Sequence, residues 1–282
     1  MDIRTELRAS GLQIDTIEPM GGGCISEIYH VRLKGGGSIV AKVDEGGNSS
    51  LPVEAFMLTY LTEHSQLPVP AVIQVTDRLL LLEYLLGESF FNPEAERHAA
   101  VLLAGLHSIT SDTSGFHQDT LIGGLRQPNS PTRSWIDFFR EQRLLYMAQE
   151  AMKAGRLPAI LLRRVENLCD RLENYLFEPA QPSLIHGDVW TTNILASGGR
   201  ITGFLDPAIY FAHDEIELAF TTLFHTFGPD FFDEYQQHRP LAPGFFEERR
   251  DIYNLYPLLV HVRLFGGSYL SSVEHLLSGF GY

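Results

Sequence analysis

The chain has 282 residues and a formal net charge of −14, and 44% of its residues are hydrophobic while 20% are charged. This balance is typical of a globular protein with a sizeable core, long enough for one large domain or for two lobes around a cleft. The acidic balance argues against nucleic acid and against an anionic membrane as partners, because both require clustered basic residues. No apolar stretch reaches the length of a membrane span, and the first ten residues lack the apolar segment of a signal peptide, so we expect a cytoplasmic protein.

The first predicted elements are two strands, residues 12–20 and 28–33, joined by a glycine-rich turn. In this turn Gly22 and Gly23 would let backbone N–H groups approach phosphate oxygens, with Cys24 and Ser26 beside them. A glycine-rich hairpin is also a common structural turn, so it needs support from the residues that follow.

A third predicted strand, residues 38–43, carries Lys42 among apolar residues. A buried cation needs partners, because an unpaired buried charge is costly. The helix that we expect to begin after Pro52 carries Glu54 in its first turns, and this carboxylate is a suitable partner. The alternative is a solvated lysine at a sheet edge and a glutamate that merely favours the helix dipole.

The β-rich portion ends after one more strand pair, and helical patterns follow. The pair covers residues 71–75 and 79–82, and Glu83, Tyr84 and Leu85 lead out of it. Beyond it we expect a helix from Asn92 to His107, a long loop over 115–133, and amphipathic helices over 135–152 and 157–177.

The catalytic candidates concentrate in residues 184–206. A His-Gly-Asp triplet ends at Asp188, Asn193 follows five positions later, and two short apolar runs around a Ser-Gly-Gly turn end at Asp206. The two runs predict a hairpin that returns Asp206 to the site. Phosphoryl transfer from ATP needs a base for the attacking hydroxyl, together with oxygen ligands for Mg²⁺, and these residues supply both. The alternative is a surface loop that happens to hold two aspartates and an asparagine.

Another predicted helix begins shortly after Asp206, with His213, Asp214 and Glu215 at its start. These residues would orient the catalytic loop or bind a cationic acceptor, and compensation of the helix dipole explains the two acids equally well. The last stretch, residues 249–277, predicts two helices separated near Gly266.

Taken together, the elements predict an α+β, two-lobed protein-kinase-like fold. Residues 1–86 would form the nucleotide-binding lobe, a small antiparallel β-sheet with one helix, and residues 87–282 a larger, mainly helical lobe for catalysis and substrate binding. In such a fold Glu83, Tyr84 and Leu85 would offer backbone groups to the adenine of ATP. A plain exit from strand to loop is an equal interpretation of these three residues.

Nearly the whole chain resembles the fructosamine kinase family, the ketosamine 3-kinases, which belong to the aminoglycoside phosphotransferase-like branch of the protein-kinase fold. The motifs that carry the resemblance are residues 22–27, the His-Gly-Asp-Val-Trp sequence ending at Trp190, Asp206-Pro207-Ala208, and residues 255–261 with 265–269. Two departures are Glu217, where an aspartate is more common, and Thr191-Thr192, where serine and glycine are common.

The resemblance implies transfer of the ATP γ-phosphoryl group to the 3-hydroxyl of a ketosamine, after which the adduct falls apart and returns the free amine, a deglycation. Asp188 would accept the hydroxyl proton, Asn193 and Asp206 would hold Mg²⁺, and Lys42 would position the phosphates. Trp190 would border the sugar or its amine. The alternatives are a related kinase acting on an aminoglycoside, a choline-like alcohol or homoserine, and a pseudokinase that only binds nucleotide.

The two cysteines, Cys24 and Cys169, fit a reducing compartment. We expect a monomer. Backbone dipoles in the glycine-rich turn would lower the pKa of Cys24 and permit a redox dimer through it, although a small buried residue in the turn is the simpler interpretation.

Overall fold

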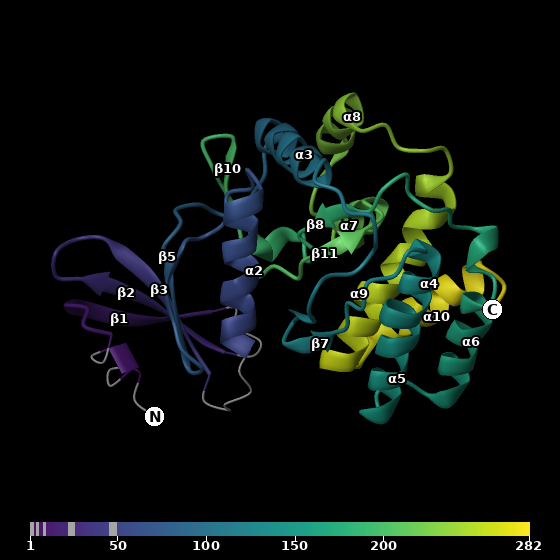
Figure 1. The fold of residues 1–282 in the computed structure, drawn as a ribbon, viewed down its shortest axis with the longest axis horizontal. Helices are drawn as coiled ribbons and strands as arrows, with labels where there is room; N and C mark the ends of the chain where they lie inside the picture. Colours follow the sequence, from purple (N-terminus) through teal and green to yellow (C-terminus); the bar gives the residue numbers. More distant parts are fainter. Residues whose placement is uncertain (1–2, 4–5, 8–9, 22–25, 45–49) are drawn as a thin grey trace.

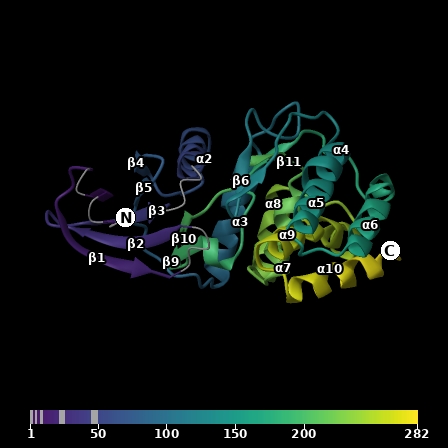
Figure 2. The same cartoon turned by 90° about the horizontal axis from the view of Figure 1, so that it is seen from below.

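A computed structural model of the chain describes residues 3, 6–7, 10–21, 26–44 and 50–282. Its two lobes lie side by side, with the sheet-rich lobe on the left of Figure 1 and the helical lobe on the right. Figure 2 shows the same division from below. This arrangement confirms the predicted α+β two-lobed fold, whereas the exact boundary after residue 86 stays a prediction. No helix in the described part of the chain is long and apolar enough to cross a membrane.

The N-terminal lobe is built on a five-stranded antiparallel sheet with the strand order β1-β2-β3-β5-β4. Successive side chains of a strand point to opposite faces, so the sheet has two apolar surfaces. In β5, Leu79 and Leu81 pack on one face, and Leu80 and Leu82 pack on the other, against helix α2. The elements are β1 (Ile14–Met20), β2 (Glu27–Leu33), β3 (Ser38–Val43), α2 (Ser50–His64), β4 (Val72–Val75) and β5 (Leu79–Glu83).

The same alternation along β3 determines the direction in which Lys42 points. Ala41 of β3 belongs to the apolar cluster on the face away from α2, whereas Val40 packs with the cluster formed by α2. Lys42 has the parity of Val40 and therefore points to the same side as α2. Figure 1 shows that this helix stands between the sheet and the helical lobe, so Lys42 faces the space between the lobes.

The C-terminal lobe begins with a helix whose start follows the expected signals. The side chain of Asn92 accepts a hydrogen bond from the Ala95 N–H at 2.9 Å, and Pro93 occupies the first helical position. The α-helices are α3 (Pro93–His107), α4 (Trp135–Phe139), α5 (Tyr146–Lys153), α6 (Ala159–Cys169), α7 (Glu215–Leu223), α8 (Pro229–His238), α9 (Arg250–Phe265) and α10 (Ser268–Gly279). Two π-helical segments, Arg140–Leu145 and Phe245–Arg249, lead into α5 and α9, and short 3-10 turns cover Leu172–Asn174 and Thr191–Asn193.

Three small antiparallel strand pairs complete this lobe. They are β8 (Ser183–Ile185) with β11 (Tyr210–Ala212), β9 (Ile194–Ser197) with β10 (Arg200–Phe204), and β6 (Thr120–Ile122) with β7 (Leu125–Gln127). The second pair is the hairpin expected before Asp206. The third pair lies within residues 115–133, where we expected only a loop, because strands of three residues are too short to show an alternating pattern.

Candidate active site

Lys42 forms an ion-pair bridge between the lobes. Its Nζ donates to Glu54 Oε1 at 2.6 Å and to Asp206 Oδ1, although Asp206 is far away in the sequence. Burial alone would lower the pKa of Lys42, but the carboxylates of Asp206 and Glu54 outweigh it and raise that pKa. Burial raises the pKa of Glu54, while the ammonium of Lys42 opposes this. The predicted Lys42–Glu54 contact is therefore present, and the lysine stays charged beside the cavity.

Asp188 and Asn193 are joined within the catalytic stretch. The Asn193 amide Nδ2 donates to Asp188 Oδ2 at 2.8 Å and to the Asp188 carbonyl at 3.1 Å. Because Nδ2 is used in this way, the Oδ1 atom of Asn193 remains as an oxygen ligand. Burial and the neighbouring Asp206 raise the pKa of Asp188 well above its usual value, and the Asn193 hydrogen bond opposes them only in part.

The β9–β10 hairpin brings Asp206 back to this pair. The Leu205 N–H donates to the Asn193 carbonyl at 2.8 Å, so the residues before and after the hairpin lie against each other. Asp206 adopts a left-handed backbone conformation, with φ of 53°, which is uncommon for a non-glycine residue. The turn presents the Asp206 carboxylate to Lys42 while leaving 46% of its side chain exposed.

The turn that carries Asp188 is held from behind by Glu217 of α7. Glu217 Oε1 accepts the Gly187 N–H at 2.6 Å, and its Oε2 accepts the His186 N–H at 3.2 Å. His107 of α3 donates from Nε2 to the same Oε2 at 2.8 Å, and its Nδ1 lies 2.7 Å from the Tyr235 hydroxyl. Burial would raise the pKa of Glu217, but His107, His186 and the Gly187 N–H lower it, so the residue is a carboxylate.

Sequence reasoning missed this support. Its only signals were a glutamate in place of the more common aspartate and a histidine at the end of a helix. Gly187 has a φ of 86°, and a Cβ there would lie 2.2 Å from the Ala208 carbonyl oxygen, so the position admits only glycine.

A cavity of about 580 Å³ opens in front of these groups. Its volume lies within the range of small-molecule sites. Its lining includes polar and charged residues, which we call the charged wall: Ser26, Lys42, Glu54, Asp188, Asn193 and Asp206. It also includes two glycines and four aromatic residues, which we call the aromatic wall: Gly123, Gly124, Trp190, His261, Phe265 and Tyr269.

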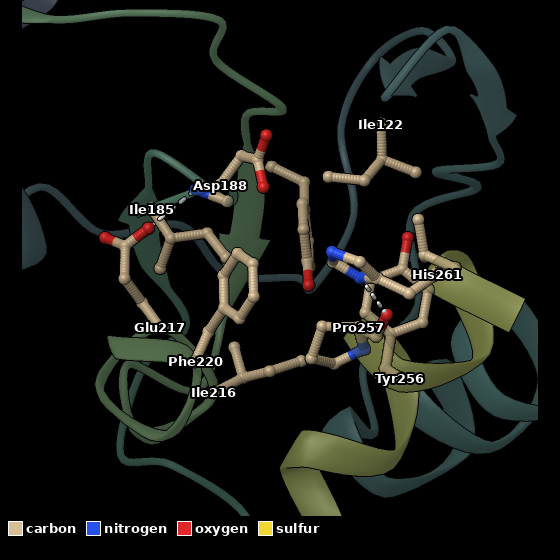
Figure 3. Close-up of a pocket in the computed structure, with 12 residues that line it drawn as sticks. Ile122, Ile185, Asp188, Ile216, Glu217, Phe220, Tyr256, Pro257 and His261 are labelled. Atoms are coloured by element: carbon tan, nitrogen blue, oxygen red, sulfur yellow. Dashed lines mark hydrogen bonds between the residues drawn. The ribbon is translucent and has the colours of Figure 1, made fainter. Parts of the chain in front are cut away.

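A recess of about 30 Å³ adjoins Asp188. In Figure 3 Asp188 borders it on one side, and Tyr256, Pro257 and His261 of α9 border it on another. Its lining is mostly apolar, which accounts for the desolvation that raises the pKa of Asp188.

The aromatic wall is a connected cluster. The ring of Trp190 lies 5.3 Å from Phe224 and 6.2 Å from His261, and Tyr269 lies 4.7 Å from His261. The Pro257 carbonyl can only accept, so His261 Nδ1, at 2.7 Å, carries the proton toward it. Burial lowers the pKa of His261, which keeps the ring neutral. Aromatic faces of this kind attract cations.

The residues at the start of α7 do not line this cavity. Asp214 pairs with Arg239 at 2.8 Å and with His213 Nδ1 at 3.0 Å, and Glu215 pairs with Arg249 at 2.7 Å. Burial would raise the pKa of Asp214, but its hydrogen bond with His213 and the nearby cations hold that pKa well below its usual range. These side chains tie α7 to later segments of the lobe.

The structure brings the other predicted nucleotide contacts to this cavity only in part. Ser26 lines the cavity, whereas Gly22, Gly23 and Cys24 lie outside the described residues. Glu83, Tyr84 and Leu85 leave the sheet at the end of β5 and do not line this cavity. The Tyr84 ring stacks on His30 with centroids 4.4 Å apart, and Leu85 packs against Gly203.

Known proteins resemble this chain in both sequence and fold. The sequence model of a family described as fructosamine kinase matches residues 2–280. A probable ketoamine kinase of Vibrio parahaemolyticus is 34% identical over 262 residues, covering 90% of this chain and 88% of that protein. The chloroplastic protein-ribulosamine 3-kinase of Arabidopsis thaliana is 31% identical over 286 residues, covering 99% of this chain and 86% of that protein. The crystal structure of a candidate fructosamine-3-kinase from Thermobifida fusca has a TM-score of 0.86 and 29% identity, covering 96% of each chain.

Proposed function

Because the chain belongs to the fructosamine kinase family, we propose that it transfers the γ-phosphoryl group of ATP to the 3-hydroxyl of a ketosamine. The observation that carries this proposal is the placement of Asp188 on the same cavity as Lys42, Asn193 and Asp206. The names of the relatives, ketoamine kinase and protein-ribulosamine 3-kinase, support the acceptor class. The phosphorylated adduct would then break down and release the free amine, which makes the reaction a deglycation.

In this proposal the phosphates of ATP lie against Lys42. Its ammonium is held by Glu54 and Asp206 at the cavity wall, so it offers a positioned cation to an oxygen of the phosphates. Ser26 lines the same cavity, and its hydroxyl would add a hydrogen bond. Gly22, Gly23 and Cys24 would add backbone N–H groups, and the backbone of residues 83–85 would bind the adenine.

The residues in the catalytic stretch fit Mg²⁺. The free Oδ1 of Asn193 and the exposed part of the Asp206 carboxylate are hard oxygen ligands, which this cation prefers. Two protein ligands suit Mg²⁺, which usually completes its shell with water and substrate phosphates. When bound, Mg²⁺ would supply neutralisation of the negative charge on the phosphates of ATP. Asn193 and Asp206 would hold it next to Lys42.

Asp188 is the proposed base. Its Oδ2 is fixed by the Asn193 amide, and its other oxygen is available to an acceptor hydroxyl. The raised pKa of Asp188 makes its carboxylate a stronger proton acceptor than that of a solvated aspartate. The rest of the rate gain would come from positioning.

The acceptor would occupy the aromatic side of the cavity. There Trp190, His261 and Tyr269 line the cavity, and the rings of Trp190 and Tyr269 would attract the cationic amine of a ketosamine. Asp214 and Glu215 are committed to ion pairs with Arg239 and Arg249, and His213 contacts Asp214, so we leave these three residues out of the proposed acceptor site.

A panel of acceptors tests the proposal. The enzyme is assayed with ATP and Mg²⁺ on ribulose-lysine and fructose-lysine, with kanamycin, choline and homoserine as other acceptors and Asp188→Asn as the control. The proposal is supported if the wild type phosphorylates a ketosamine and Asp188→Asn does not. Activity confined to one of the other acceptors would overturn it.

We further propose a cytoplasmic monomer. The support is the acidic composition and the bacterial ketoamine kinase relative of similar length. Light scattering under reducing conditions should give one species near 31.7 kDa. Mild oxidation of wild type and Cys24→Ser tests the redox dimer, because a disulfide through Cys24 would appear in the first protein alone.

A further inference from the structure

The β6–β7 hairpin contacts the cavity through its tip. Leu121, Ile122, Gly123 and Gly124 all line the cavity of about 580 Å³. Gly123 has a φ of 51°, and a Cβ on it would lie 2.8 Å from the Leu264 side chain of α9. The tip is therefore a closely fitted part of the cavity wall.

At the base of the hairpin, the side-chain amide of one glutamine makes three hydrogen bonds. Gln127 is completely buried. Its Nε2 donates to Thr120 Oγ1 at 2.9 Å and to the Ala208 carbonyl at 3.0 Å, and its Oε1 accepts the Tyr256 hydroxyl at 2.7 Å. One side chain thus connects the hairpin with helix α9 and with the segment that follows Asp206.

Two neighbours extend this contact. The Thr120 hydroxyl donates to the Ile209 carbonyl at 3.2 Å and accepts from Asn129 Nδ2 at 2.8 Å. Asn129 Oδ1 in turn accepts from the buried Arg143 at 2.6 Å, and the Arg143 guanidinium lies 3.8 Å from the Tyr210 ring centroid. The hairpin base therefore binds two successive backbone carbonyls, those of Ala208 and Ile209.

These carbonyls belong to the segment that fixes both catalytic aspartates. Ala208 lies two residues after Asp206, and its N–H donates to the His186 carbonyl at 2.7 Å. Its carbonyl oxygen lies 2.2 Å from the position that a Cβ on Gly187 would occupy, and Gly187 directly precedes Asp188. A shift of this carbonyl would therefore move Asp206 and the Asp188 turn together.

We propose that Gln127 is a positioning residue. It would hold Asp206 at a fixed position relative to the β6–β7 hairpin, whose tip lines the proposed acceptor site. The inference rests on the proposed function for the identity of the acceptor, whereas the contacts of Gln127 do not depend on that identity. Satisfying buried polar groups is the simpler role for such an amide. The two roles differ in what a substitution would change, because mere loss of stability reduces the active fraction without changing affinities.

Gln127→Met tests the proposal, since it keeps the length of the side chain and removes the amide. Thr120→Val removes the neighbouring hydroxyl at almost unchanged volume, and serves if the first variant does not fold. Arg126→Gln is the matched control, because Arg126 is next in sequence but exposed and paired with Asp119. Each protein is assayed for acceptor KM and kcat, and for the affinity of a non-hydrolysable ATP analogue with and without Mg²⁺.

For Gln127→Met we expect the gain in nucleotide affinity on adding Mg²⁺ to shrink about tenfold, as happens when groups that orient metal ligands are removed. Nucleotide affinity without Mg²⁺ should be unchanged, acceptor KM should rise and kcat should fall. Thr120→Val should change the same quantities less, and Arg126→Gln should match wild type. A folded Gln127→Met with wild-type Mg²⁺ dependence and acceptor KM overturns the inference. A wild type inactive on all ketosamines overturns the proposed function, and the nucleotide titration still tests Gln127.

Discussion

The Glu217→Gln substitution should weaken both the fold and catalysis. Glu217 Oε2 accepts from His107 and from the His186 N–H, whereas Oε1 accepts the Gly187 N–H alone. The carbonyl oxygen of glutamine can take the place of Oε2 and keep both of its hydrogen bonds. Its NH₂ group then faces the Gly187 N–H, so two donors meet in a buried site and one hydrogen bond to a charged group is lost.

The size of the effect follows from that single bond. A hydrogen bond to a charged group contributes about 1.5–3 kcal/mol, and the free energy of unfolding should fall by this amount. The corresponding decrease in Tm for a chain of 282 residues is about 3–5 °C. Gly187 directly precedes Asp188, and a displacement of about 1 Å at a reacting group costs about 100-fold in rate. We therefore expect kcat to fall by about 10–100-fold.

Urea unfolding and steady-state kinetics measure the two effects, with Glu234→Gln on α8 as a control, because Glu234 is partly exposed and pairs with the exposed His238. The lowered pKa of Glu217 gives stability that is present above its unfolded pKa and lost as pH falls through its folded pKa. The stability difference between Glu217→Gln and wild type should therefore narrow in acid. A variant with wild-type stability and kcat at neutral pH would refute the reasoning.

Two further substitutions test the charged wall of the cavity. Lys42→Met removes the cation between Glu54 and Asp206, so kcat/KM for ATP should fall by about 100-fold or more; an unchanged value would exclude contact between Lys42 and the phosphates. Asp188→Asn should lower kcat by about 10²–10⁴-fold while nucleotide still binds, measured by turnover and titration. Because burial raises the pKa of Asp188, wild-type activity should fall as pH decreases through that raised value, and a pH–rate profile without this limb would contradict the assignment. The same raised pKa means that the ionised carboxylate weakens the fold above it, so Asp188→Asn should unfold at a higher temperature than wild type at neutral pH.

Much of the fold was predictable because its signals are local. The Asn92-Pro93 start of α3, the hairpin before Asp206 and the end of α9 before Gly266 each depend on a few adjacent residues. The approach of Lys42 to Glu54 was also predictable, since a strand and the next helix bring them together.

The rest depends on contacts between residues far apart in the chain. Asp214 and Glu215 looked available for an acceptor because the arginines that pair with them, Arg239 and Arg249, come much later in the chain. The contacts of Glu217 and Gln127 likewise join separate helices, strands and loops. Spacing along the chain carries no information about such contacts.

The most direct test of the proposed reaction is the identity of its product. The enzyme is incubated with ATP, Mg²⁺ and the ribulosamine of a lysine derivative, and NMR follows the position of the phosphate and the release of the amine. We predict phosphate on the 3-hydroxyl, followed by free amine, and neither with Asp188→Asn. Phosphate at another position, or equal product from the variant, would contradict the proposed reaction.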